Sequence, residues 1–270
     1  MATPIGNLGD ITSRALDTLR RADIVAAEDT RHTRALLSHF GISAKLVALH
    51  RHNERRAGEQ VLEWIAAGKS VALVSDAGTP AVSDPGAVVV DAVRASGARA
   101  IPVPGASALT AALSASGLGY DGIVFAGFLP AKGAERRARL RSLAEGPWAI
   151  ALFEAPHRVK ATLADLHAAL GDRDVVIARE VTKRFETIAR MPLADALAWV
   201  QADSDRARGE FVLLVEGRDP GPRAGGTDPR AVLEALLAEL PVKQAAALAA
   251  KITGARRNAL YAMALEMKDL

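Results

Sequence analysis

The sequence predicts an α/β protein that consists of two α/β domains and a small helical region after them. In the first part, short β-rich runs alternate with amphipathic segments of helix length, which is typical of a parallel sheet covered by helices. In the second part, two β-rich runs lie so close that only a turn fits between them, which indicates an antiparallel pair. The last part is rich in Ala and Leu and follows a Gly- and Pro-rich stretch.

These changes of pattern give the domain boundaries. We expect a first α/β domain with a mostly parallel sheet at residues 1–117, and a second α/β domain with a mixed sheet at residues 118–218. A linker is expected at residues 219–227, and three short helices within residues 228–270.

In the first domain the β-rich runs predict strands at residues 22–28, 45–50, 70–76 and 99–105. The segments around them predict helices at residues 12–22, 31–40, 56–68 and 85–97. Helix starts are marked by Thr12 and by Asp84 with Pro85 in the first turn, and helix ends by Gly41, Gly68 and Gly97.

In the second domain the runs predict strands at residues 122–128, 148–154, 174–180, 186–191 and 210–217. Helices are expected near residues 135–144, 157–169 and 193–201. The antiparallel pair is formed by the third and fourth of these strands, because only a short connection separates them.

Composition limits the kind of protein. Half of the 270 residues are hydrophobic, enough for a full core. Cysteine is absent, which excludes disulfides and zinc-thiolate sites and agrees with a reducing compartment. No apolar run approaches the roughly 18 residues that suggest a membrane span. We therefore expect a soluble, cytoplasmic protein that does not enter a membrane.

The charge is unevenly distributed. The formal net charge of +3 says little about partners. Residues 128–160, however, contain seven Lys or Arg and three Glu. This cluster is suited to neutralising phosphates, but it can equally be the solvated face of a helix.

Five polar loops, three of which carry Gly and Pro, are expected after the strands of the first domain, at residues 3–7, 28–31, 50–53, 75–86 and 104–108. In an open parallel sheet these loops lie at one edge, where ligands bind. Each loop also has a purely structural interpretation. The Gly and Pro residues can serve turn geometry. Glu28, Asp29 and Arg31 can form a helix start with an ion pair, and the two histidines, His50 and His52, can be surface residues. Together the five loops predict a site.

The missing motifs narrow the choice of ligand. The sequence contains no GxGxxG after the first predicted strand and no GxxxxGK[ST] anywhere, so dinucleotide and P-loop sites lose their main support. It has no HExxH or similar cluster, so we expect no metal site. Small residues in these loops, without a lysine to meet a polyphosphate, favour a nucleoside-like ligand held by backbone amides and carbonyls.

Seven ordered motifs carry a resemblance to a known family: ATPIGNLGDIT, AEDTR, LVSDAGTPAVSDPG, VPGASALTAALSASGL, FAGFLP, FEAPHR and REVTKRFE. The chain resembles, over nearly its whole length, the tetrapyrrole-methylase (class III methyltransferase) family, and within it the branch that methylates a cytidine ribose 2′-hydroxyl in small-subunit (16S) ribosomal RNA. The resemblance implies S-adenosyl-L-methionine as the cofactor, a cofactor cleft between the two α/β domains and a homodimer. Residues 240–265 also resemble the helix-turn-helix-like tail of that branch.

The resemblance implies a set of cofactor-binding residues. Ala77, Gly78, Thr79 and Val82 correspond to the loop that meets the methionine part and the nearby ribose. Ile5 corresponds to a residue of the first cofactor loop, and Ser107 and Ala108 to the third. The adenine is expected against Phe153 and the backbone of Glu210 and Phe211.

A ribose 2′-hydroxyl is a weak nucleophile, so we expect it to be oriented, desolvated and offered a proton acceptor. The candidate acceptors are Glu28, Asp29, His157, Glu180 and Lys183, of which Glu28, His157 and Glu180 are taken as the catalytic set. His157 can also be a helix cap or a surface residue, and Glu180 with Lys183 can be a structural ion pair. No single residue is singled out as the base.

Cations around the site are expected to contact RNA phosphates: Arg31, Arg158, Lys183, Arg256 and Arg257. Arg256 and Arg257 begin a predicted helix, where cations oppose the helix dipole unless an anion binds there. A helix pair that completes a dimer or packs on the core is the alternative for this tail.

Two further expectations concern the chain start and the function. Relatives usually begin with several more residues that form the first strand, so we expect either a late start codon or a missing strand, with lower stability as the result. The alternatives to ribosomal RNA methylation are a tetrapyrrole (corrin or precorrin) methyltransferase and a non-catalytic ribosome-assembly factor that binds RNA.

Overall fold

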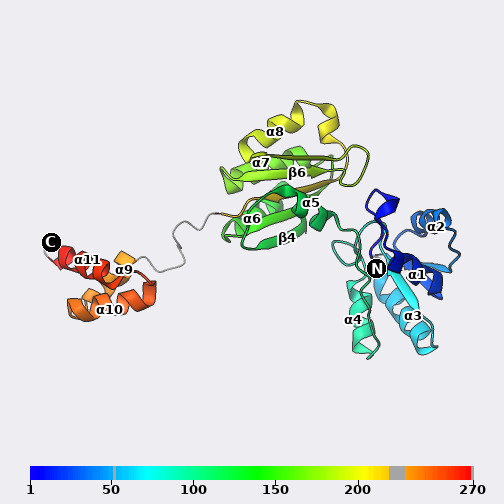
Figure 1. The fold of residues 1–270 in the computed structure, drawn as a ribbon, viewed down its shortest axis with the longest axis horizontal. Helices are drawn as coiled ribbons and strands as arrows, with labels where there is room; N and C mark the ends of the chain where they lie inside the picture. Colours follow the sequence, from blue (N-terminus) through cyan, green and yellow to red (C-terminus); the bar gives the residue numbers. More distant parts are fainter. Residues whose placement is uncertain (51–52, 219–228, 269–270) are drawn as a thin grey trace. The chain divides into compact units, whose positions relative to one another are not determined.

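The computed structural model describes residues 1–50, 53–218 and 229–268. The chain forms two compact units, Met1–Arg218 and Asp219–Leu270 (Figure 1). The larger unit contains two β-sheets with helices, and residues 229–268 of the smaller one form helices without strands, so the predicted α/β class with a helical C-terminal region is confirmed. The predicted linker at residues 219–227 lies outside the described residues.

The first sheet consists of three parallel strands in the order β2-β1-β3, with β1 at Ile24–Ala27, β2 at Leu46–Ala48 and β3 at Val71–Val74. All four residues of the central strand β1 are buried, because helices cover both faces. Helices α1 (Ser13–Arg21) and α2 (Thr30–His39) supply Leu19 and Leu37 to the core with Val25 and Ala27. Helices α3 (Glu54–Ala66) and α4 (Ala87–Ala95) supply Val61, Val89 and Val93 to the core with Ala26.

The predicted helix boundaries are correct at most ends in this domain. The Thr12 hydroxyl accepts a hydrogen bond from the N–H of Ala15 at 3.1 Å, which caps α1. Gly41, Gly68 and Gly97 all have a left-handed backbone, with φ of 62°, 76° and 81°, and each follows the end of a helix.

The start of α4 differs from the prediction. Asp84 and Pro85 lie before the helix, which begins at Ala87 after Gly86. Its first N–H groups are capped from another helix, because the Glu54 carboxylate accepts hydrogen bonds from Gly86 N–H at 2.7 Å and Val88 N–H at 3.0 Å. A local sequence pattern does not reveal this cap, since Glu54 is more than 30 residues away in the chain.

The strand predicted at residues 99–105 does not form, and residues 98–107 have no regular structure. A strand needs a partner along its length. Here the neighbouring segment is Met1–Thr3, in which Ala2 N–H donates to the Val103 carbonyl at 3.1 Å. The same short segment reaches the end of β3: the Met1 amine donates to the Leu73 carbonyl at 2.7 Å, and Thr3 exchanges two backbone hydrogen bonds with Gly78.

The second sheet has five strands in the order β4-β5-β8-β6-β7. They are β4 (Ile123–Phe128), β5 (Ala149–Glu154), β6 (Asp174–Arg179), β7 (Thr187–Pro192) and β8 (Phe211–Val215). Strands β4 and β5 are parallel, and the other neighbours, β6 and β7 among them, are antiparallel. The predicted mixed sheet and its antiparallel pair are therefore confirmed.

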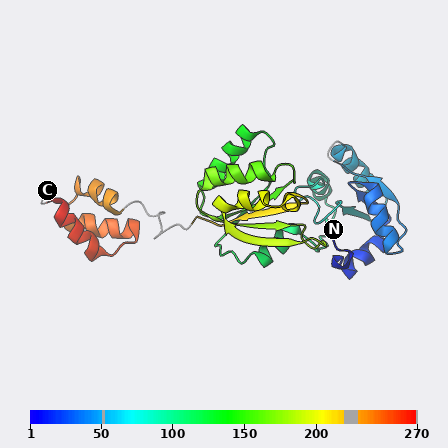
Figure 2. The ribbon, with the colours of Figure 1, turned by 90° about the horizontal axis from the view of Figure 1, so that it is seen from above.

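Helices cover both faces of this sheet, as Figure 2 shows. On one face α6 (Gly133–Ala144), α7 (Val159–Leu170) and α8 (Leu193–Gln201) pack on alternate strand residues such as Ile150, Leu152 and Leu213. On the other face α5 (Ala108–Ser116) packs through Ala112 on residues such as Ala151 and Val212. The sequence pattern did not indicate α5. The boundary at Gly117 stays a prediction, but α5 precedes it and already packs on the second sheet.

The described part of the smaller unit contains three helices, as predicted: α9 (Pro229–Leu237), α10 (Val242–Thr253) and α11 (Arg257–Lys268). Small residues let the helices pack closely, with Ala245, Ala246 and Ala249 of α10 buried beside Leu233 and Leu260. Gly254, with φ of 71°, ends α10. In the part of the chain that the structure describes, no helix is long and apolar enough to cross a membrane.

The Glu54 cap gives a first prediction. The substitution Glu54→Ala leaves two N–H groups at the start of α4 without their acceptor, so the free energy of unfolding should fall by about 1 to 2 kcal/mol. Chemical denaturation of both proteins measures this difference. The matched control is Glu59→Ala on the exposed side of the same helix α3, which should have a much smaller effect. Equal losses for the two variants would mean that the cap adds nothing.

Candidate active site

One cavity of about 430 Å³ lies between the two α/β parts of the larger unit. Loops after β1 and β3, together with the segments around Ile5 and Ser107, form one wall, and the ends of β4, β5 and β8 form the other. The volume lies in the range that small-molecule sites usually have, about 300 to 1,000 Å³. Four of the five predicted loops reach this cavity, and the loop at residues 50–53 is not among its lining residues.

All ten residues predicted to bind the cofactor line this cavity. They are Ile5, Ala77, Gly78, Thr79, Val82, Ser107, Ala108, Phe153, Glu210 and Phe211. The cavity therefore brings together residues that lie more than 200 positions apart in the sequence. Their individual contacts with a cofactor stay a proposal.

Gly78 holds three of the loops together. Its backbone is left-handed, with φ of 78°, and its N–H and carbonyl both bond to Thr3. A Cβ at Gly78 would lie 3.3 Å from Cγ2 of Ile5, tighter than ordinary contact, so the glycine also permits the close approach of the first loop. From the next residue, the Thr79 hydroxyl donates to the Ala106 carbonyl at 3.4 Å, which connects the third loop.

Aromatic rings form part of the second wall. Phe153 lies edge-on to Phe125 and Phe128, with ring centroids 4.9 and 5.7 Å apart. Phe128 lines the cavity and remains 53% exposed. Such a wall suits a flat ring system that packs against apolar faces.

The cavity wall is acidic. Its lining residues include five carboxylates, from Glu28, Asp76, Asp84, Glu154 and Glu210. Glu154 is paired with Arg158 and Glu210 with Lys183, so the excess of negative charge comes from the other three. Carboxylates in a partly closed site favour a positively charged ligand and oppose a polyanion. The site is thus suited to a cationic ligand with a flat ring, and unsuited to a nucleotide polyphosphate.

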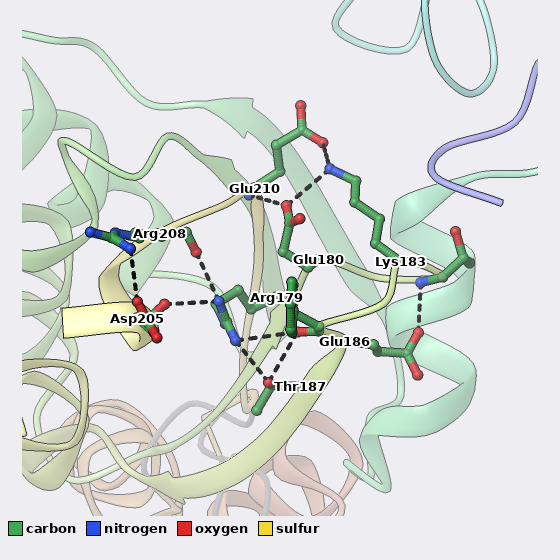
Figure 3. Close-up of polar contacts among 10 residues, drawn as sticks. Arg179, Glu180, Lys183, Glu186, Thr187, Asp205, Arg208 and Glu210 are labelled. Carbon is green, nitrogen blue, oxygen red and sulfur yellow. Dashed lines mark hydrogen bonds and ion pairs between the residues drawn. The ribbon is translucent and has the colours of Figure 1, made fainter. Parts of the chain in front are cut away.

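Lys183 lies between two carboxylates, as Figure 3 shows. Its ammonium is 2.9 Å from Glu180 Oε1 and 2.8 Å from Glu210 Oε2. Burial alone would lower the pKa of Lys183, but these two hydrogen bonds outweigh it and raise the pKa. Burial would likewise raise the pKa of Glu180, but the N–H of Glu210 and the ammonium of Lys183 lower it. At neutral pH Lys183 is therefore a cation and Glu180 an anion.

The Lys183 side chain also lies against the first loop. A Cβ added at Gly6 would overlap the Cγ of Lys183, so glycine is the residue that leaves room for this lysine. The contact connects the loop between β6 and β7 with the start of the chain, across the cavity that Lys183 and Ile5 both line.

The three catalytic candidates occupy different positions. Glu28 lines the cavity. Glu180 lies behind the wall and is engaged by Lys183, the structural ion pair that the sequence left open. His157 is exposed and does not line the cavity, because α7 begins only at Val159 and it is Pro156 that faces the site. The role of His157 as a proton acceptor stays a prediction, without support from the cavity lining.

Two of the predicted phosphate-binding arginines lie in the larger unit. Arg31 is exposed beside the site, where it pairs with Asp29 at 2.8 Å. Hydrogen bonds from Arg31 hold the pKa of Asp29 well below its usual range, so this pair stays ionised. Arg158 instead turns inward: it donates to the carbonyls of Leu129 and Pro130 and lies 3.1 Å from Glu154. Its guanidinium is occupied within the domain, which removes Arg158 from the phosphate-binding set.

Arg256 and Arg257 are exposed at the start of α11, as the sequence predicted. Asp29, considered as a proton acceptor, caps α2 by accepting from the Arg31 N–H at 2.8 Å. The Asp29 N–H in turn donates to Asp76 Oδ1 at 2.8 Å, which ties the start of α2 to the cavity wall. Within the described residues, no group of three or more His, Asp or Glu side chains is arranged to hold a metal ion.

Sequence reasoning missed several lining residues, among them Asp76, Ser83, Asp84, Phe128 and Val181. Asp76 and Asp84 lie in the quoted loop after β3, and Asp84 was interpreted as a helix start. Phe128 belongs to the quoted motif FAGFLP, but only the folded sheet shows that this strand end reaches the cavity.

Comparisons with known proteins show to which protein family the chain belongs. The sequence model of the Tetrapyrrole (Corrin/Porphyrin) Methylases matches residues 2–197, and that of the RsmI C-terminal HTH domain matches residues 223–268. A Pseudomonas aeruginosa protein named "Ribosomal RNA small subunit methyltransferase I" is 52% identical over 98% of this chain and 95% of its own length.

Solved structures share the fold of the larger unit. The methyltransferase CobJ has a TM-score of 0.58 at 23% identity, covering 78% of this chain and 90% of its own. Uroporphyrin-III C-methyl transferase from Thermus thermophilus, solved in complex with S-adenyl homocysteine, has a TM-score of 0.54 at 18% identity, covering 78% of this chain and 93% of its own.

The ion pair at Glu180 predicts a pH-dependent stability. Because the folded pKa of Glu180 lies below its ordinary value of 4.5, the carboxylate contributes stability above that value and loses it as the pH falls through the folded pKa. Glutamine resembles the protonated acid. The loss of unfolding free energy caused by Glu180→Gln should thus be present at about pH 7 and shrink towards about pH 3.

Urea denaturation across this pH range measures the loss. Glu63→Gln on the exposed surface of α3 is the control, and its effect should not change with pH. A loss for Glu180→Gln that is the same at both ends of the range would contradict the stabilising ion pair.

Proposed function

This chain belongs to the tetrapyrrole (corrin/porphyrin) methylases, and we propose that it transfers a methyl group from S-adenosylmethionine to the ribose 2′-hydroxyl of a cytidine in small-subunit ribosomal RNA. The proposal depends above all on one observation: an acidic cavity with an aromatic wall, at which four loops of the first domain meet the strand ends of the second.

The residues of the cavity fit S-adenosylmethionine. The cofactor carries a sulfonium and an ammonium, which the carboxylates of Glu28, Asp76 and Asp84 attract. Its adenine suits the wall of Phe128 and Phe153, and the apolar surface of Ile5 and Val82 suits its aliphatic part. When bound, the sulfonium supplies both the methyl group and a good leaving group for an in-line displacement. A relative with the same fold was solved with S-adenyl homocysteine, which supports the same choice.

RNA is favoured over a tetrapyrrole as the methyl acceptor. Tetrapyrrole precursors are polyacids, and the carboxylates of Glu28, Asp76 and Asp84 in the cavity wall repel them. A ribose is neutral, and its phosphates can remain outside the cavity near exposed cations such as Arg31. The C-terminal helices with Arg256 and Arg257, and the name of the Pseudomonas relative, point to the same substrate.

Catalysis needs orientation of the ribose and an acceptor for its proton. We assign the acceptor role to Glu28, the catalytic candidate that lines the cavity. Lys183, held as an ammonium between Glu180 and Glu210, can donate to the 2′-oxygen and orient it. Because the cation also stabilises charge on that oxygen as the proton leaves, Glu28 and Lys183 act together on one atom.

The assembly, location and target of the enzyme complete the proposal. We assign the chain to the cytoplasm, where small ribosomal subunits are found, and to a homodimer, as the family resemblance suggested. The target is a cytidine of the decoding region in the assembled subunit.

The proposal predicts the product of one assay. Small subunits from cells that lack this chain, incubated with the protein and labelled S-adenosylmethionine, should yield labelled 2′-O-methylcytidine in nucleoside mass spectrometry. Naked ribosomal RNA and a tetrapyrrole precursor are tested in parallel. Label in the precursor alone would overturn the RNA assignment, and no label at all, with cofactor binding intact, would favour a non-catalytic assembly factor.

Gly78→Val is the matched loss-of-binding variant for that assay. Valine adopts the left-handed backbone of Gly78 only with strain, and its side chain meets Ile5. Cofactor affinity, measured by calorimetry, should fall below detection while the circular dichroism spectrum stays native. A Gly78→Val protein that binds as tightly as the wild type would refute the assignment of this loop.

The two candidate bases give opposite predictions. Glu28→Gln should lower kcat about 100-fold or more, because an amide cannot accept the proton, while cofactor affinity changes little. His157→Gln should leave kcat within about twofold, because this side chain does not line the cavity. Single-turnover methylation of small subunits measures both. The reverse order of effects would transfer the role of base to His157.

A further inference from the structure

The loop of residues 180–186, which connects β6 with β7, holds an aromatic ring in solvent. Phe185 is 65% exposed, more than any other large aromatic side chain among the described residues. Exposure of a phenyl ring forfeits the free energy that its burial would contribute. The exposed position of Phe185 therefore points to a function only if other contacts hold the loop in this conformation.

The loop is rigidly built. The Arg179 guanidinium donates to the carbonyl of Phe185 itself at 3.2 Å, and also to the carbonyls of Asp205 and Arg208 and to the Thr187 hydroxyl (Figure 3). The N–H of Thr182 donates to the Glu186 carboxylate at 2.6 Å. These bonds stabilise two left-handed non-glycine residues, Glu180 and Thr182, with φ of 52° and 67°. The backbone at Phe185 is thus fixed while its ring stays outside.

A cation accompanies the ring. The Arg184 guanidinium lies over the Phe185 ring, 5.5 Å from its centroid, and Arg184 is itself exposed. An exposed phenyl ring beside an arginine is the combination on which unpaired nucleobases stack, with the guanidinium adding a second flat surface and a charge for the phosphate. A purely apolar partner would gain nothing from Arg184.

Phe185 follows a residue of the cavity wall, Lys183, by two positions in the chain. Lys183 lines the cavity, and two residues of extended chain span at most about 7 Å. Successive nucleotides of a stacked strand are about 3.4 Å apart. A nucleotide next to the one whose ribose enters the cavity is therefore within reach of Phe185.

We propose that Phe185, with Arg184, is a stacking platform for an unpaired nucleobase that flanks the methylated nucleotide. This inference rests on the proposed function, because it needs an RNA substrate. The platform fixes the neighbouring base while Lys183, from the same rigid loop, meets the ribose in the cavity. It contributes to the binding of RNA and not to that of the cofactor.

The test compares KM for small subunits with affinity for S-adenosylmethionine. Phe185→Ala should raise KM for subunits about 5- to 150-fold, the range that base stacking on an aromatic residue gives. Phe185→Trp should restore wild-type KM, whereas Phe185→Leu, which is apolar but not aromatic, should not. The affinity for S-adenosylmethionine should be the same in all four proteins.

Tyr120→Ala is the matched control. Tyr120 is also an exposed aromatic residue of the second α/β part. It precedes strand β4, and Phe128 at the other end of this strand lines the cavity. The length of the strand places Tyr120 about 20 Å from the cavity. Its replacement should leave KM unchanged. An unchanged KM in Phe185→Ala, or rescue by leucine as complete as by tryptophan, would overturn the platform.

A second measurement identifies what lies on the ring. With p-benzoylphenylalanine at position 185, irradiation in the presence of small subunits should give a crosslink to ribosomal RNA. A crosslink only to a second copy of this chain, or a change of molecular mass in Phe185→Ala, would show a protein contact instead and overturn the proposal. Failure of the proposed function is distinguishable, because the wild-type protein would then methylate no subunits at all.

Discussion

The backbone bridge between Thr3 and Gly78 is the constraint on which the candidate site depends. Two hydrogen bonds join these residues, and the Thr3 hydroxyl donates to the Ser75 carbonyl at 3.0 Å. The bridge fixes the loop after β3 against the start of the chain, and through the neighbouring Thr79 it reaches Ala106. Because Gly78 is left-handed and lies against Ile5, no other residue type meets both requirements without strain. The geometry of one wall of the cavity thus follows from one glycine.

The second organising feature is the separation of charge. Carboxylates line the cavity, whereas Arg31 and Arg184 of the same unit are exposed and do not line it. A cationic cofactor inside and a polyanionic substrate outside require this arrangement, because each charged partner is attracted to its own place and repelled from the other. Lys183 is the exception. Its two carboxylate partners offset its charge, so it places a hydrogen-bond donor in the cavity without making the cavity basic.

The seven-residue connection between β6 and β7 places one residue, Lys183, at the cavity and two others, Arg184 and Phe185, in solvent. Glu180 and Thr182 adopt backbone conformations that side chains rarely tolerate, and the Arg179 hydrogen bonds stabilise them. Strained backbone that the surroundings hold in place is common at functional sites. In this loop the strain turns Lys183 towards the cavity while Phe185 and Arg184 remain exposed.

The sequence by itself determined the alternation of strands and helices, most helix ends and the set of loops that form the site. These features depend on local patterns: hydrophobic periodicity, caps such as Thr12, glycines after helices, and the rule that loops after parallel strands meet at one edge. Ile5, Gly78 and Ser107 could be named in advance because the quoted motifs resemble the cofactor loops of the methylase family.

Only the tertiary structure decided which polar side chains are available to bind a ligand and which are engaged within the protein. It turned Arg158 inward to the Leu129 carbonyl, paired Lys183 with Glu210, excluded His157 from the cavity and capped α4 with Glu54. It also left residues 99–105 without a full strand partner. Each of these outcomes depends on groups that are distant in the chain and near in space. Local patterns cannot specify them, since a side chain's partners are fixed only when the sheets and helices have packed.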